Sequence, residues 1–380
     1  RLRKSMCRER ALNLPFRAEH IGSLLRPPSL LDIRRRHAAG EVDAEDLQIA
    51  EDNAIISAIA LQERVGLKVV TDGEYRRFAY NDFFFEHLGD VTITAPPVNT
   101  EDAREGAKRA PQPIAVVKSR LRWAAPIHAG EVNFLKKHAK AMPKITLPGP
   151  CALHFRGGAM QIQRYEAYSD LNIFWADIIE AYANELKSLA ENGCNYVQFD
   201  ETAFAKFSDP AVQHALAKRG DNWQELIDQY IEITNRVLAR APKSLVIGMH
   251  LCRGNRGGHF HAEGGYEVFA EKLFNALDIK FYFLEYDSPR AGDFSPLRFL
   301  PPAKSVVLGL VSTKSEDLEK KDDLKRRIEE AANYVDMNRL AISPQCGFAS
   351  IAEGNPITPE MQEAKLRLVV EIANEIWPDA

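Results

Sequence analysis

Short β-type segments alternate with longer helical segments along most of this chain, and this alternation constrains its fold more than any other feature. Eight runs have the composition of buried strands: residues 15–22, 67–73, 143–149, 195–200, 244–250, 280–286, 305–311 and 340–346. Amphipathic stretches begin at Ala44, Asn172, Asn222, Tyr266, Ser315 and Thr358. This pattern is typical of an α/β protein whose parallel sheet closes into a (β/α)8 TIM barrel. We predict a single barrel domain over residues 1–380.

Residues 89–142 interrupt the alternation. They contain two β-like runs, "VTITAPPV" and "QPIAVVKSRLRW", separated by the polar segment "NTEDAREGAKRA". We predict an insertion here, a hairpin that leaves the barrel and covers one end of it.

Charge and hydropathy exclude several classes of partner. The net charge is −4, without blocks of like charge, which gives no basis for binding nucleic acid or an anionic membrane. Apolar runs such as 306–311 are far shorter than the roughly 20 residues that a membrane span needs. The basic start "RLRKSMCRER" is followed by no apolar signal region. We therefore expect a soluble protein whose partners are small molecules, and we leave open whether it forms a homo-oligomer.

The five cysteines are few, odd in number and widely spaced, at positions 7, 151, 194, 252 and 346. This usage argues against a disulfide framework and predicts a reducing, cytoplasmic compartment. Free thiols in such a compartment bind metal, react or simply pack. Cys151 and Cys194 are interpreted as core residues.

The predicted strand ends are rich in polar residues, and in a barrel of this kind the catalytic groups lie at the C-terminal ends of the strands. The residues there are Glu19, His20, Ser23, Asp72, Glu74, Asp200, Glu201, His250, Cys252, Glu285, Asp287 and Cys346. An unpaired carboxylate beside a desolvated interior is unfavourable, so we expect a positive group or a metal ion among them.

Zinc is the ion that these residue types favour. Imidazole, thiolate and carboxylate groups are its usual ligands. His250 and Cys252 stand two apart at one strand end, and Glu285 and Cys346 follow neighbouring strands. The alternative interpretation is a packed histidine beside an inert buried cysteine. Two thiolates and a carboxylate would make zinc a poor Lewis acid for hydrolysis but would suit the activation of a thiol, which predicts S-alkylation.

Several stretches, in order along nearly the whole chain, resemble one known family. They are "FRAEHIGSLLRP", "GLKVVTDGEYRR", "ITLPGP", "VQFDE", "GMHLCRGN", "FLEYDSPRAGDF", "VVLGLVSTKSEDLE" and "LAISPQCGFAS". The chain resembles the catalytic C-terminal barrel of cobalamin-independent methionine synthase, and more closely the stand-alone members of that superfamily. The resemblance implies a methyltransferase of methionine biosynthesis that methylates homocysteine from a methylated folate or corrinoid.

The same resemblance implies site residues. Zinc would be held by His250, Cys252, Glu285 and Cys346. Ile21 and Ser23 would bind the amino-acid part of homocysteine. Glu74 and Asp200 would be both catalytic and substrate-binding, since two carboxylates suit an ammonium group. The alternative for these two acids is a structural salt bridge with Arg17, Arg76 or Arg77.

The half of the site that binds the methyl donor departs from the family. The loop after the seventh strand reads "LVSTKSED", with Lys314 and no histidine, and "CALHFRGG" follows "GP" with Phe155 but no tryptophan. The resemblance includes no counterpart of the N-terminal half of the full-length synthase. A different alkyl donor is therefore an open alternative. Arg253 and Arg290 are candidates for binding a substrate carboxylate or phosphate, and the alternative is that they pair with Asp287 or Asp293. His259 and His261 lie in a glycine-rich loop near the metal pair.

Three other functions compete with methylation of homocysteine. The first is alkylation of another thiol, for example addition to an epoxide or the reverse reaction. The second is a decarboxylase of the related uroporphyrinogen family, which needs no zinc. The third is a non-catalytic zinc-binding homologue.

Overall fold

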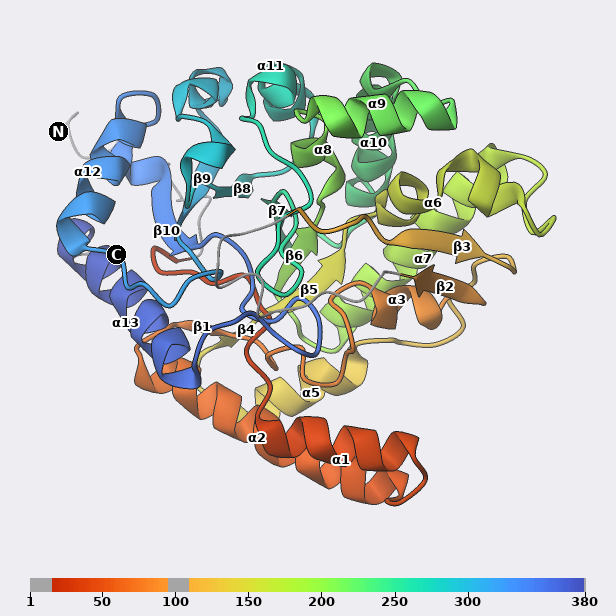
Figure 1. Cartoon of the computed structure of the whole chain (residues 1–380), viewed down its shortest axis with the longest axis horizontal. Helices are drawn as coiled ribbons and strands as arrows, with labels where there is room; N and C mark the ends of the chain where they lie inside the picture. The colour runs from red at the N-terminus through yellow and green to blue at the C-terminus, as the bar shows by residue number, and fades with distance from the viewer. Residues whose placement is uncertain (1–15, 95–108, 379–380) are drawn as a thin grey trace, which may run out of the picture.

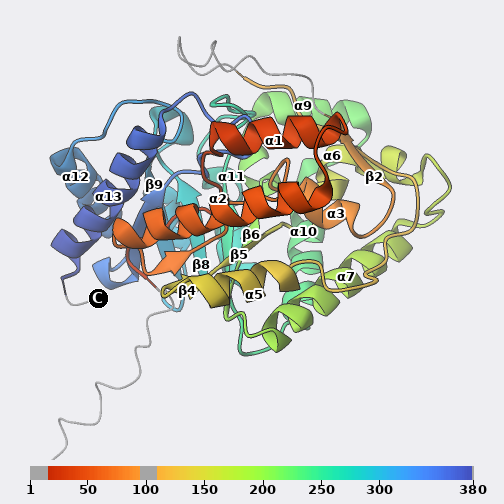
Figure 2. The same cartoon turned by 90° about the horizontal axis from the view of Figure 1, so that it is seen from below.

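The computed structural model describes residues 16–94 and 109–378. The basic start of the chain and most of the polar segment inside the insertion lie outside these ranges. Within them the chain forms a ring of parallel strands surrounded by helices (Figures 1 and 2).

Six parallel strands form the main sheet, in the order β10-β9-β8-β7-β6-β5. Their bounds are β5 Ile145–Pro148, β6 Tyr196–Asp200, β7 Val246–Leu251, β8 Phe281–Glu285, β9 Ser305–Val311 and β10 Leu340–Pro344. A short strand β1 (Val69–Val70) pairs in parallel with β4 (Met142–Pro143), which directly precedes β5. The register aligns Asp200 with His250, so these two strand ends lie side by side.

The first predicted strand, residues 15–22, is reduced to one parallel bridge between Ala18 and Ile342. Backbone hydrogen bonds with Ile342 hold its first half, and side chains bind its last two carbonyl groups. Thr71 Oγ1, just after β1, donates to Gly22 O at 2.6 Å, and Gln198 Nε2 in β6 donates to Ile21 O at 2.6 Å. A backbone hydrogen bond from Leu24 to Gly73 O, 3.1 Å, then joins this segment to the chain after β1. The barrel predicted from the alternation is confirmed, with a first strand that bonds partly through side chains.

The helices cover the outside of the sheet (Figures 1 and 2). They are α1 Pro28–Ala38, α2 Ala44–Arg64, α3 Asp82–Glu86, α5 Ala129–His138, α6 Ala152–Gln163, α7 Leu171–Glu191, α8 Ala203–Lys206, α9 Pro210–Arg219, α10 Trp223–Leu238, α11 Glu267–Ala276, α12 Lys321–Ala332 and α13 Pro359–Ile376, with 3-10 turns at Pro289–Ala291, Ser295–Phe299 and Met337–Arg339. None of the described helices combines the length and apolar character that a bilayer crossing requires.

Five of the six predicted helix starts are confirmed to within one residue, and the sixth is wrong. Ser315 does not begin a helix, because α12 starts only at Lys321. The acidic side chain of Glu319 accepts hydrogen bonds from the Ser312 amide at 2.7 Å and from Lys365 Nζ at 3.0 Å. These bonds tie residues 312–319 down as a loop over the strand end.

The insertion contains the predicted hairpin. Strand β2 (Val91–Thr94) pairs antiparallel with β3 (Ile114–Val117). The hairpin packs against α6 (Figure 1), where a Cβ on Gly157 would lie 2.6 Å from the carbonyl oxygen of Ala115. A glycine is needed here because the two backbones approach so closely.

A buried ion pair fixes the turn after β1. Arg77 Nη2 lies 2.9 Å from Glu131 Oε2, and Arg77 Nη1 donates to the Thr146 carbonyl at 2.9 Å. Burial alone would raise the pKa of Glu131, but the guanidinium of Arg77 lowers this pKa below its usual value. The pair therefore holds the segment that carries Glu74 against β5.

We expect Glu131→Gln to lower the free energy of unfolding at pH 7 by about 3 kcal/mol, because it removes the nearer counter-ion of the buried Arg77. A carboxyl whose pKa is lowered by folding stabilises the protein above its unfolded pKa. That contribution is lost as the pH falls through the lower, folded pKa. The difference between the two proteins in urea unfolding should thus shrink below pH 4.5. The exposed pair Arg36–Glu41 gives the control Glu41→Gln, for which we expect less than about 0.5 kcal/mol.

Candidate metal centre and substrate cavity

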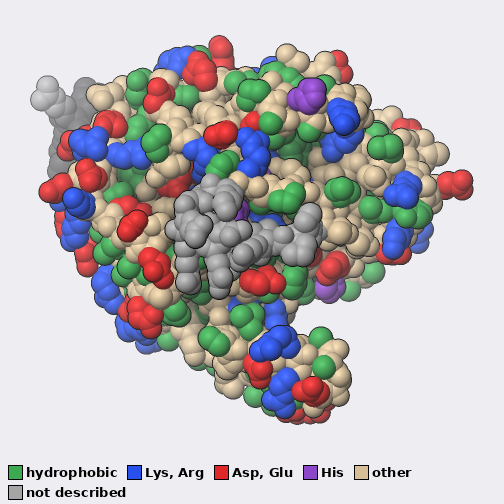
Figure 3. All heavy atoms as spheres, in the orientation of Figure 1, with side chains coloured by type: hydrophobic (Ala, Val, Ile, Leu, Met, Phe, Trp, Pro, Cys, Tyr) green, Lys and Arg blue, Asp and Glu red, His purple; other side chains and the backbone are tan. Residues whose placement is uncertain are grey.

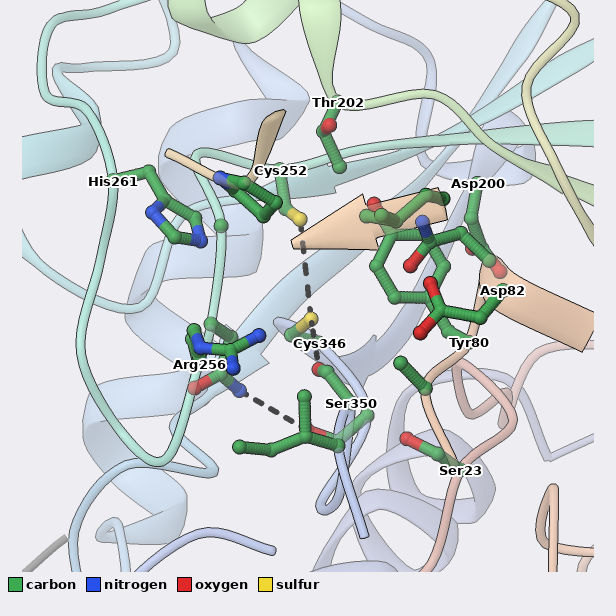
Figure 4. A pocket seen from close by; sticks show the side chains of 18 of the residues that line it. Ser23, Tyr80, Asp82, Asp200, Thr202, Cys252, Arg256, His261, Cys346 and Ser350 are labelled. Atoms are coloured by element: carbon green, nitrogen blue, oxygen red, sulfur yellow. Dashed lines mark hydrogen bonds between the residues drawn. The ribbon is translucent and has the colours of Figure 1, made fainter. Parts of the chain in front are cut away.

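A cavity of about 430 Å³ opens where the strands end. Its walls come from the ends of several barrel strands and from the hairpin, which contributes Ile93, Thr94 and Pro113. On the face shown in Figure 3 basic and acidic side chains are interspersed rather than gathered by sign. Figure 4 looks into the cavity and shows the sulfur atoms of Cys252 and Cys346 pointing toward each other.

The predicted thiol and imidazole ligands lie together in this cavity. His250 and Cys252 are placed by β7 and Cys346 by the loop after β10, and their ligand atoms all lie within 4.8 Å of one another. The two sulfur atoms are 3.9 Å apart. All three residues are buried, and neither ring nitrogen of His250 has a hydrogen-bond partner among the described residues. Two sulfurs and an unpartnered imidazole form a donor set that fits zinc.

The electrostatics of the pair also suit a cation. The thiol of Cys346 donates a hydrogen bond to the sulfur of Cys252, which lowers the pKa of Cys252 well below its usual value, and the neighbouring His250 adds to this effect. The same contact raises the pKa of Cys346. One sulfur of the pair is therefore disposed to be a thiolate, which is the form that binds metal.

Glu285, the fourth predicted ligand, is not part of this three-residue cluster. Its carboxylate contacts Arg290 Nη2 at 2.5 Å, Lys314 Nζ at 3.2 Å and the Arg253 amide at 2.7 Å. Burial alone would raise the pKa of Glu285, but Lys314, Arg290 and Arg253 together hold this pKa below its usual range. Arg253 and Arg290, considered above as substrate-binding cations, thus hold Glu285.

The two predicted ammonium-binding carboxylates both line the cavity. Glu74 Oε1 accepts a hydrogen bond from Thr146 Oγ1 at 2.8 Å, while its Oε2 is buried without a partner in the described chain. Asp200 Oδ1 accepts from Gln198 Nε2 at 2.8 Å, and burial raises the pKa of Asp200 to about 7. Two nearby carboxylates that lack full pairing favour the binding of a cationic group.

The salt-bridge alternative accounts for little of this arrangement. Arg17 bonds to backbone carbonyl groups, and Arg76 pairs with Glu51 and Asp52. Arg77 reaches Glu74 only at 4.0 Å and has Glu131 as its nearer partner.

Ile21 and Ser23 also line the cavity, beside the loop that carries Cys346. The amide of Ala349 donates to Ser23 Oγ at 3.3 Å, and a Cβ on Gly347 would lie 1.9 Å from that oxygen. Gly347 therefore allows the Ser23 turn to approach the Cys346 loop closely.

Three cations in the cavity wall were not anticipated from the sequence: Arg156 in α6, Lys206 in α8 and Arg256 in the loop after β7. His261 lines the cavity as well, whereas Phe155 is not among its lining residues. The sequence does not predict that these cations meet in one cavity, because they come from helices and loops whose side-chain directions depend on tertiary packing. Two "RGG" runs, at 156–158 and 256–258, contain two of these arginines. The first allows close packing against the hairpin, and the second belongs to a "GNRGG" stretch that lacks the spacing of a phosphate-binding loop.

Comparison with known proteins gives consistent matches over nearly the whole chain. The family model described as "Cobalamin-independent synthase, Catalytic domain" matches residues 16–375. The Bacillus subtilis protein YxjG, described as uncharacterized, is 40% identical over 370 residues, covering 96% of this chain and 95% of that protein. A methionine synthase of Pyrococcus abyssi is 23% identical over 86% of this chain and 85% of its own length.

A solved structure gives the same result for the fold. The putative vitamin-B12 independent methionine synthase from Listeria monocytogenes superposes with a TM-score of 0.72 at 30% sequence identity, covering 96% of this chain and 98% of that one.

Proposed function

We propose, from the premise that this chain belongs to the family of cobalamin-independent synthase catalytic domains, that it transfers an alkyl group to the sulfur of a small thiol. The acceptor we propose is homocysteine and the group a methyl. The observation that carries this proposal is the presence, in one cavity, of the His250, Cys252 and Cys346 cluster and of two incompletely paired carboxylates.

The residues that would hold zinc are His250, Cys252 and Cys346, with Glu285 as the fourth ligand. Bound zinc lowers the pKa of a thiol and so supplies a nucleophilic thiolate. Glu285 stands on β8, next to β7, and the cations around it keep it ionised. As a ligand it would exchange part of its contact with Arg290 or Lys314 for the ion.

The carboxylates and the serine turn would orient the acceptor. Glu74 and Asp200 would receive its ammonium group, with charge-assisted hydrogen bonds to the unpartnered Glu74 Oε2. Ser23 and the backbone at Ile21 would hold its carboxylate. Bound in this way, the acceptor directs its sulfur toward the cysteine pair. The catalytic contribution of these residues is positioning, which lowers the entropic part of the barrier.

The bond changes are those of a simple displacement. The proton of the acceptor's thiol passes to solvent, and its sulfur forms a bond to the alkyl carbon. The bond between that carbon and the leaving atom breaks, with the electron pair staying on the leaving atom, which takes up a proton from solvent. The hairpin residues Ile93, Thr94 and Pro113 form part of the cavity wall and would limit the access of water to the reacting atoms.

This proposal is tested by product analysis with defined donors. Purified, zinc-loaded protein is incubated with homocysteine and either a methylated folate or methylcobalamin, and methionine is measured by mass spectrometry. We expect methionine to form only when protein, acceptor and one of these donors are all present.

The competing thiol alkylation gives a different product in the same assay. A thioether from homocysteine or another thiol with an epoxide, together with no methionine from either methyl donor, would move the assignment to that reaction. The set of potential zinc ligands argues against the zinc-free decarboxylase.

A further inference from the structure

We infer that the substrate that donates the alkyl group carries a compact anionic group, a carboxylate, phosphate or sulfonate, which is bound by Arg156, Lys206 and Arg256. This inference rests on the proposed function and deepens it, since it assigns a substrate class to the half of the cavity where this chain departs from its family. It concerns binding only.

The three cations line the same cavity as the cysteine pair, and two of them are almost completely buried. The exposed fraction is 1% for Lys206 and 8% for Arg156. Lys206 Nζ donates to Gln112 Oε1 at 3.0 Å and lies 5.5 Å from the centre of the Phe155 ring. One terminal nitrogen of Arg156 donates to the Tyr80 hydroxyl, and the other, Nη1, is buried without a partner in the described chain. Nε of Arg256 is likewise buried and unpartnered there.

Three other buried cations of the described chain stand beside carboxylates, whereas Arg26 and Lys304 bond to backbone carbonyl groups. Lys144 is 3.1 Å from Glu19, Lys365 is 3.0 Å from Glu319, and Arg77 is 2.9 Å from Glu131. Asp82 and Glu353 also line the cavity, where the charges of both act on Arg256 and that of Asp82 also acts on Arg156. In the described ranges, however, no carboxylate lies within 4.0 Å of Arg156, Lys206 or Arg256.

A buried cation that no counter-ion contacts is energetically unfavourable unless a bound anion balances its charge. Burial and, after it, the neighbouring Arg156 together lower the pKa of Lys206 to about 7. An anion bound between these groups would favour their charged forms and form charge-assisted hydrogen bonds with them. A planar guanidinium also matches the geometry of carboxylate and phosphate oxygens.

The fold holds Arg156 firmly in this position. It stands in the first turns of α6, and the next two residues are glycines. A Cβ on Gly157 would lie 2.6 Å from the Ala115 carbonyl oxygen of the hairpin, and a Cβ on Gly158 would lie 2.7 Å from Nε of Arg219. Gly158 also has a φ of 63°, in the left-handed region that favours glycine. The hairpin and α9 thus fix the segment that presents Arg156, which is the preorganisation that a binding site needs.

The cations belong to the donor rather than to the acceptor. Figure 4 shows Arg256 and His261 across the cysteine pair from Asp200. An acceptor whose ammonium lies at Glu74 and Asp200 has its sulfur at the cysteine pair, so an incoming alkyl group approaches from the side that carries Arg256.

The test uses inorganic sulfate as the probe and isothermal titration calorimetry on the zinc-loaded protein. We expect millimolar binding of sulfate, weakened at least tenfold in Lys206→Met and in Arg156→Gln and largely restored by Arg156→Lys. Lys304→Met is the matched control, because Lys304 is also buried but bonds to carbonyl groups away from the cavity. Homocysteine binding is measured on every variant, so that a misfolded protein is recognised by its loss.

Each outcome separates this inference from the proposed function. Homocysteine binding without sulfate binding, or sulfate binding that is equal in all variants, would overturn the inference and leave the proposed function standing. Displacement of sulfate by homocysteine would assign the cations to the acceptor's carboxylate and overturn the assignment to the donor. Sulfate binding together with homocysteine, lost in the two charge-removing variants, supports the inference.

Discussion

Replacing either cysteine of the pair by serine is expected to lower the affinity for zinc by more than about 100-fold. Even residues that only support metal ligands typically contribute 10- to 100-fold to affinity, and the loss of a thiolate ligand removes more. Cys252→Ser and Cys346→Ser should therefore lose zinc and alkyl-transfer activity together, as measured by metal analysis after dialysis and by product formation.

Cys194→Ser is the matched control for these variants. Cys194 is buried, and its sulfur donates to the Tyr196 carbonyl at 3.3 Å outside the cavity. We expect this variant to keep its zinc. Glu285→Gln should lose zinc less than the two cysteine variants do. Full metal content in both Cys252→Ser and Cys346→Ser would refute the assignment of the ligands.

Asp200→Asn is expected to weaken homocysteine binding by about 10- to 100-fold, because hydrogen bonds to charged groups typically contribute about 1.5 to 3 kcal/mol. The reason is the loss of one of two carboxylates that face the ammonium group. The measurement is a titration of the acceptor into zinc-loaded protein. The same titration with 4-mercaptobutanoate, which has the thiol and the carboxylate but no amine, should show almost no difference between the two proteins.

Asp209→Asn controls for the loss of a buried carboxylate. Asp209 caps α9 and accepts from the Ala211 amide at 2.8 Å without lining the cavity. An equal loss of affinity for the two thiols in Asp200→Asn would show that Asp200 acts on something other than the amine.

The architecture was predictable because the sequence shows strand or helix periodicity wherever backbone hydrogen bonds hold the element in place. The strands from β5 to β10 and five of the helix starts follow from it. Prediction from periodicity failed where side chains take the place of backbone hydrogen-bond partners. Thr71 and Gln198 bind the last two carbonyl groups of the first segment, and Lys365 with Glu319 ties down the stretch before α12. Such contacts join residues far apart in the chain, so no local pattern encodes them.

The candidate site was predictable to the extent that it lies at strand ends. His250, Cys252 and Cys346 meet because parallel strands bring their C-terminal ends to one side. The cations Arg156, Lys206 and Arg256 were missed because their places depend on the packing of helices and loops. The partners of Glu285 were missed for the same reason, since Lys314 and Arg290 come from two different loops.

The most direct test of thiol activation by a bound metal is a titration of homocysteine into cobalt-substituted protein, after measuring the metal content of the protein as purified. The account predicts about one zinc ion per chain and, in the cobalt form, a thiolate-to-metal charge-transfer band that grows as homocysteine is added. Absence of bound metal, or a cobalt spectrum that no thiol changes, would contradict it.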